Sequence, residues 1–192
     1  MARRRKSKGV LSVGTVVRLI VAGTTLAGFA LFAFISVRQW ELGSTDREGW
    51  APMFWPMRAD TWPKGRAWHR DGIEVYVRVK KGFCGDCDAG IQSDEAHGRA
   101  VDIDLLHPKF AATGPGTRIR ITDLFGIARV YRRDTLLGGE ERAQAIAVTY
   151  NCDLVVAIVL GDVEDRQKLK TAHRFLESNT VQIWLNKLLD SK

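Results

Sequence analysis

The feature that most constrains this chain is a run of 19 uncharged residues, LIVAGTTLAGFALFAFISV, between Arg18 and Arg38. As an α-helix this run would extend about 28 Å, close to the hydrocarbon thickness of a bilayer. We therefore expect residues 19–40 to form a transmembrane helix. A cleaved signal peptide fits less well, because its apolar core is shorter and is followed by an A-x-A arrangement of small residues. A buried core helix would need more covering protein than a domain of about 150 residues provides.

The residues on either side of this run predict its orientation. The leader, residues 1–18, is basic, whereas the far flank RQWELGSTDRE mixes both signs of charge. Because Lys and Arg are retained on the cytoplasmic side, we expect a cytoplasmic amino terminus and an extracytoplasmic carboxyl-terminal domain. Trp40 fits the aromatic belt at the outer face of the lipid bilayer. The external part has no N-x-S/T acceptor and Arg outnumbers Lys, which favours a bacterial inner membrane with a periplasmic domain.

The net charge of +7 comes from the leader and the span. The first 40 residues contain seven of the 29 basic residues and none of the 22 acidic ones, so the rest of the chain has 22 of each. A nucleic-acid-binding domain needs a basic excess where it contacts phosphates. The sequence therefore predicts no nucleic-acid partner.

A Trp- and Pro-rich neck is expected over residues 41–70, where neither helical nor strand periodicity is present. Its tryptophans could pack inside the protein or provide contacts to a protein partner, because Trp is enriched at binding hot spots. The candidate partner contacts are Trp50, Trp55, Trp62 and Trp68.

Residues 71–192 are predicted to form an α+β domain with a mostly antiparallel sheet covered by carboxyl-terminal helices. Alternating apolar residues predict strands at 73–79, 99–105, 117–122 and 127–133, and residues 154–160 are apolar on both faces, as in a central strand. The segment around 140–150 fits either a helix or a strand, and its spacing slightly favours a helix. Apolar residues at helical spacing predict two amphipathic helices, separated by a break at 178–180.

Cys84 and Cys87 form a Cys-x-x-Cys pair directly after the first of these strands. In an oxidising compartment such a pair favours a Cys84–Cys87 disulfide. The loop that it closes is short and stabilises little, which leaves thiol-disulfide exchange open as an alternative. Cys152, ahead of the apolar strand, is interpreted as a packed thiol.

A metal site is a weaker alternative for the same cysteines. It would recruit His97 or His107, but their spacing does not match that of structural zinc sites; Cu(I) binding by the two sulfurs is a further option. Asp102 and Asp104 would share the solvated face of the predicted strand. No cofactor-binding or catalytic motif is present, so no catalytic residue and no cofactor are predicted.

These features together predict a membrane-anchored periplasmic interaction or assembly module, for example an accessory subunit of a larger membrane complex. The alternative is an envelope protein for thiol-disulfide exchange or metal handling that uses Cys84 and Cys87.

Overall fold

The computed structural model describes residues 13–58, 60–83 and 94–189, which belong to two compact units, Met1–Ser44 and Thr45–Lys192. In the first unit the described residues form one helix, α1 (Val13–Leu42). Within the part of the chain that the structure describes, no helix meets the combined length and apolarity needed to cross a membrane. The span predicted for residues 19–40 lies within α1, and its insertion into a bilayer stays a prediction from the sequence.

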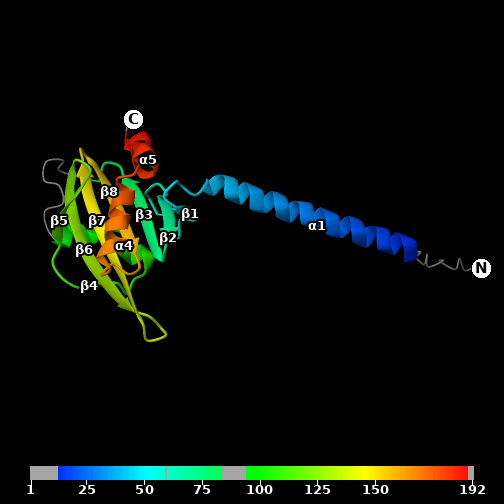
Figure 1. The fold of residues 1–192 in the computed structure, drawn as a ribbon, viewed down its shortest axis with the longest axis horizontal. Coiled ribbons are helices and arrows are strands. Elements are labelled where there is room, and N and C mark those ends of the chain that lie inside the picture. The colour runs from blue at the N-terminus through cyan, green and yellow to red at the C-terminus, as the bar shows by residue number, and fades with distance from the viewer. Residues whose placement is uncertain (1–12, 59, 84–93, 190–192) are drawn as a thin grey trace, which may run out of the picture. The chain divides into compact units, whose positions relative to one another are not determined.

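The second unit is built on one antiparallel sheet with strand order β1-β2-β3-β8-β7-β6-β4, in which β5 also pairs with β6 (Figure 1). Its strands are β1 (Ala51–Met53), β2 (Arg66–Arg70), β3 (Ile73–Lys80), β4 (Ala111–Ala112), β5 (Thr117–Ile121), β6 (Leu124–Asp134), β7 (Glu140–Tyr150) and β8 (Asp153–Leu160). The described helices of this unit are α2 (Asp94–Ala100), α3 (Ile103–Leu106), α4 (Arg166–Leu176) and α5 (Asn179–Leu189). The α+β class, the antiparallel sheet and the carboxyl-terminal helices are thereby confirmed.

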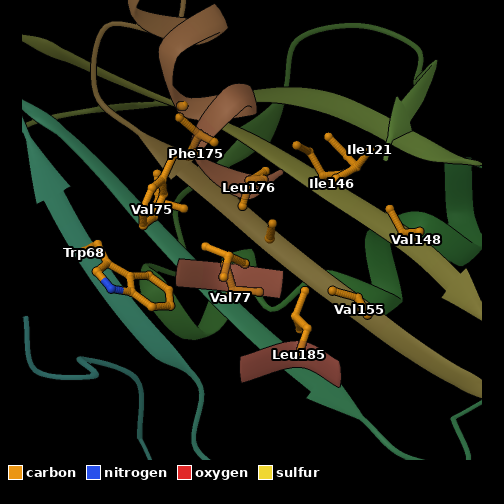
Figure 2. Close-up of a cluster of buried hydrophobic side chains, with 14 of the residues drawn as sticks. Trp68, Val75, Val77, Ile121, Ile146, Val148, Val155, Phe175, Leu176 and Leu185 are labelled. Atoms are coloured by element: carbon orange, nitrogen blue, oxygen red, sulfur yellow. The ribbon is translucent and has the colours of Figure 1, made fainter. Parts of the chain in front are cut away.

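Alternate residues of each strand point to opposite faces of the sheet. Helices cover both of these faces. Figure 2 shows Phe175, Leu176 and Leu185 from α4 and α5 against Val75, Val77 and the apolar side chains of β7 and β8. On the other face, residues of α2 and α3 pack against a second cluster that includes alternate residues of β7 and β8. The central strand β8 is therefore apolar on both sides, as its sequence predicted.

One of the predicted strands is a pair of short helices. Residues 99–105, expected as a strand, belong to the end of α2, a connection and α3. The reason is that the side chains of Ala100, Val101 and Ile103 are buried against one face of the sheet, so this segment covers the sheet instead of adding a strand to it. The prediction was wrong here, and Asp102 and Asp104 do not share a strand face, because Asp102 is buried and Asp104 is exposed.

The segment 140–150 is strand β7 and not a helix. It pairs with β6 from Gly126↔Val148 to Asp134↔Glu140 and with β8 from Ala143↔Leu160 to Tyr150↔Asp153. Two neighbouring strands thus satisfy its backbone hydrogen bonds, which outweighs the helical propensity of its alanines.

Residues 45–70 of the neck belong to the second unit, whereas residues 41–44 belong to the first. This part of the neck provides the edge strand β1 and its neighbour β2, which pair through Ala51↔His69 and Met53↔Ala67. Pro52 lies in β1, at the sheet edge, where a residue without an N–H is tolerated.

Candidate functional site

A cluster of four charged side chains, Asp60, Arg78, Lys80 and Asp102, lies on the α2–α3 face of the sheet. Arg78 Nη2 is 2.6 Å from Asp60 Oδ2 and 2.9 Å from Asp102 Oδ2, and Lys80 Nζ is 2.5 Å from Asp102 Oδ1. Arg78, Lys80 and Asp102 are buried, whereas the Asp60 side chain remains 26% exposed. The hydrogen bond from Arg78 lowers the pKa of Asp60, despite the opposing effect of burial.

This ion cluster joins three segments that are distant in the sequence. Arg78 and Lys80 belong to β3, Asp60 to the neck and Asp102 to the N-cap position of α3. Lys80 Nζ also donates a hydrogen bond to the carbonyl oxygen of Ala100, at 2.7 Å. Two cations face two carboxylates, so the cluster is electrically balanced and connects the neck and the α2–α3 segment to the sheet.

The tryptophans of the neck lie in different environments. Trp50 is 1% exposed and stacks on Phe175, with ring centroids 4.2 Å apart, and Trp68 is 4% exposed and contacts Phe175 and Trp184 edge-on. These two rings belong to the core of the domain and present almost no surface to a partner.

Trp55 and Trp62 are half-buried. Trp55 meets Tyr76 edge-on and Trp62 meets Phe83 at a tilted angle. Of the four candidate partner contacts, only these two keep substantial exposed surface. The environment of the Trp40 side chain lies outside what the structure describes.

His97 is a fully buried residue of α2. Its Nε2 lies 3.1 Å from the carbonyl oxygen of Ile127, and its Nδ1 lies 3.4 Å from the hydroxyl of Tyr131. Burial is the main reason that the pKa of His97 is lowered. His107, by contrast, is half-buried, and its Nδ1 accepts a hydrogen bond from the backbone of Lys109. Across residues 13–58, 60–83 and 94–189, no group of three or more His, Cys, Asp or Glu side chains could hold a metal ion.

Cys152 is disulfide-bonded, which corrects its interpretation as a packed thiol. The chain has three cysteines, so Cys84 and Cys87 are the two possible partners within it, and both lie outside the described residues. Cys152 lies in the exposed turn between β7 and β8, where the backbone N–H of Gly82 donates to Asp153 Oδ1 at 2.9 Å. The antiparallel pairing of β3 with β8 therefore places this turn beside the chain that follows β3.

The most exposed apolar side chains of the domain are at the tip of the β6–β7 hairpin, which extends beyond the other strands (Figure 1). Leu136 and Leu137 are each 99% exposed. The turn is ordered by hydrogen bonds between Thr135 and Gly139, including Thr135 N to Gly139 O at 2.7 Å and Gly139 N to Thr135 Oγ1 at 3.0 Å. The tip therefore presents two leucines on a defined backbone.

The sequence did not reveal this tip, because residues 140–150 fit either a helix or a strand and their spacing slightly favours a helix. The run DTLLGGE between two alternating segments is the signal that could have revealed it, since paired glycines between strands indicate a hairpin turn.

The fold defines this protein as an α+β domain with a single antiparallel sheet, preceded by a separate long helix. The chain matches no protein-family model, and no curated protein shows detectable sequence similarity to it.

Proposed function

We propose that this protein is a membrane-anchored, periplasmic interaction module that docks onto a protein partner through the tip of its β6–β7 hairpin. The observation that supports this proposal best is the exposure of Leu136 and Leu137, 99% each, on an ordered turn. Two leucines in water gain about 1.5–3 kcal/mol each when a partner buries them fully. The two exposed leucines of the tip are suited to insert into an apolar pocket of a protein partner.

The charges around the tip favour a protein partner over a lipid surface. Arg132 pairs with Glu140 at 3.5 Å, Arg133 pairs with Glu141, and Arg142 pairs with Glu140 and Glu164. Binding to anionic lipid needs a surplus of Lys and Arg. At this tip each cation already has a carboxylate partner, so the two leucines are the feature left to direct binding.

Anchoring is proposed for residues 19–40 on the basis of their uncharged, apolar sequence and the basic leader. The continuous helix α1 is consistent with this role, because a helix satisfies its own backbone polar groups. The hydroxyls of Thr24 and Thr25 both donate to the carbonyl oxygen of Val21, which lowers the cost of placing them in lipid. A bacterial inner membrane is proposed because the external part of the chain has no N-x-S/T acceptor and Arg outnumbers Lys.

The test replaces the tip leucines in the full-length protein. We expect Leu136→Asp with Leu137→Asp to abolish co-purification of a partner from mild detergent, while Ile183→Asp, a change at an exposed apolar residue of α5, preserves it. A photoreactive amino acid at position 137 should form a protein adduct that the same amino acid at position 183 does not form. Adducts to lipid alone, or equal co-purification in both variants, would refute docking through this tip.

Thiol-disulfide exchange is a second candidate, favoured by the disulfide of Cys152 in a chain with three cysteines. In such an exchange the thiolate of the third cysteine attacks the disulfide, forms a new S–S bond and releases one sulfur as a thiolate. We expect Cys152 to be disulfide-bonded in both single variants, Cys84→Ser and Cys87→Ser. A structural disulfide would instead be lost in one variant only. The measurement is labelling of the cysteine thiols with a membrane-impermeant mass tag, applied to intact cells before and after reduction.

A further inference from the structure

A cavity of about 210 Å³ lies between α5 and the sheet, at the end where β7, β8 and the β5–β6 turn meet. Its walls are mainly apolar and consist of Ile121, Leu124, Val148, Val155, Leu185 and Leu189. An apolar cavity of about 150 Å³ is already large enough to take up benzene and stays free of water. This cavity therefore has the size and the lining of a binding site for an apolar group.

The cavity adjoins a narrow void of about 30 Å³ deeper in the core. Ile121, Val148, Val155 and Leu185 line both spaces, and residues such as Leu176 and Val181 line only the smaller one. The group that enters must be slender and must carry no polar atoms at its inner end, because these walls offer no hydrogen-bond partner. A peptide segment does not fit this requirement, since its backbone N–H and C=O groups would be buried without partners.

The rim of the cavity is polar, and none of the described residues that line it is a cation. Asp123 is paired with Arg120 at 2.7 Å, and the side-chain amide of Gln182 donates to the carbonyl oxygen of Leu176 at 2.7 Å. Thr122, Tyr150 and Asn186 add hydroxyl and amide groups to the lining. A carboxylate or phosphate end group would meet Asp123 without a cation to compensate it, whereas a hydroxyl end group finds hydrogen-bond partners.

We infer that this cavity binds a single alkyl chain that ends in an uncharged polar group, as in a long-chain alcohol. The site is separate from the hairpin tip. The inference does not depend on the proposed docking function, although a membrane anchor would keep the cavity close to a source of alkyl chains.

The test uses full-length protein in phosphatidylcholine nanodiscs and a long-chain alcohol with a diazirine on its chain. After photolysis, we expect labelled peptides that include Val148, Val155 or Leu185. Leu189→Trp, which fills the mouth of the cavity, and Val155→Phe, which fills its interior, should each lower this labelling at least fivefold. Ile183→Trp is the matched control, because it adds the same bulk at a residue of α5 that is 69% exposed.

The outcomes separate the inference from the anchor. Labelling confined to residues 19–40 would overturn binding of the alcohol in the cavity and would support the membrane anchor. Labelling of the cavity residues alone would support binding in the cavity and would refute the anchor. Equal cavity labelling in the parent, Leu189→Trp and Val155→Phe proteins would overturn the inference. The unlabelled alcohol should displace the probe at concentrations at which the corresponding fatty acid does not, and equal displacement by the acid would contradict the uncharged end group.

Discussion

Arg78 and Lys80 are two buried cations in a strand whose other face is entirely apolar. Each can be buried only because a carboxylate from another segment reaches it, Asp60 and Asp102 for Arg78 and Asp102 for Lys80. The sequence IEVYVRVK shows two cations at alternate positions of an apolar strand, which indicates that partners are needed. It does not indicate which acids provide them, because Asp60 and Asp102 are brought close only by the folded neck and by α3.

At this cluster we predict that Asp102→Ala lowers the free energy of unfolding by about 3–5 kcal/mol, because it leaves Lys80 and Arg78 buried without their shared carboxylate. Asp104→Ala is the matched control, since Asp104 is exposed in the same short helix and should change stability little. Urea unfolding of the full-length protein in mild detergent measures both changes. Equal losses in the two variants would show that the ion cluster does not stabilise the fold.

At the scale of elements, the spacing of apolar residues correctly predicted those segments in which the apolar residues are the buried ones. The strands at 73–79, 117–122, 127–133 and 154–160 and the two carboxyl-terminal helices are present as predicted. The sequence left β7 open between helix and strand because Ala143, Ala145 and Ala147 have high helical propensity, and the pairing with β6 and β8 makes the segment a strand. β1 and β2 were missed because they are only three and five residues long and their burial does not alternate along the strand.

Helix α4 has a well-defined amino-terminal cap. Asp165 Oδ1 accepts hydrogen bonds from the backbone N–H groups of Gln167 at 2.8 Å and Lys168 at 3.2 Å. We predict that Asp165→Ala lowers stability by about 1 kcal/mol, because two N–H groups of the first turn lose their acceptor. Asp165→Ser should retain most of this stability, since Ser is also a good cap, and the urea midpoints of the three proteins compare them directly. If Ser were as destabilising as Ala, the cap would not be the cause.

On the scale of the whole molecule, the sequence predicted the α+β class but not the sites. The ion cluster and the α5 cavity each combine residues from elements that are far apart in the chain, so their existence depends on strand order, whereas the hairpin tip is a local turn between the consecutive strands β6 and β7. The order β3-β8-β7-β6 places β8 beside β3, although four other strands lie between them in the sequence. The same pairing brings the Cys152 turn beside the end of β3, which no local pattern could indicate.

Two histidines on opposite faces of the sheet, the buried His97 and the half-buried His173, make the stability of the domain dependent on pH. Burial lowers the pKa of His97 and that of His173, whose Nε2 lies 2.6 Å from Gln144 Oε1. Both rings are therefore neutral in the folded domain at pH 7, whereas in the unfolded chain they gain protons below a pKa of about 6.5. The unfolded state then binds more protons, so stability is fully present above about pH 7 and falls as the pH drops below 6.5.

We predict a loss of up to about 1.4 kcal/mol per pH unit for each histidine between about pH 6.5 and its folded pKa. This window lies above the ordinary pKa of an Asp side chain, and the hydrogen bond from Arg78 lowers the pKa of Asp60 further. His97→Gln keeps a donor and an acceptor near Ile127 and Tyr131 but cannot be protonated, so its stability should fall less steeply between pH 7 and pH 5.5 than that of the parent. His69→Gln, at an exposed residue of β2, should leave the slope unchanged. Urea titrations at several pH values give these slopes, and a parent curve that is flat across this window would contradict the neutral burial of both rings.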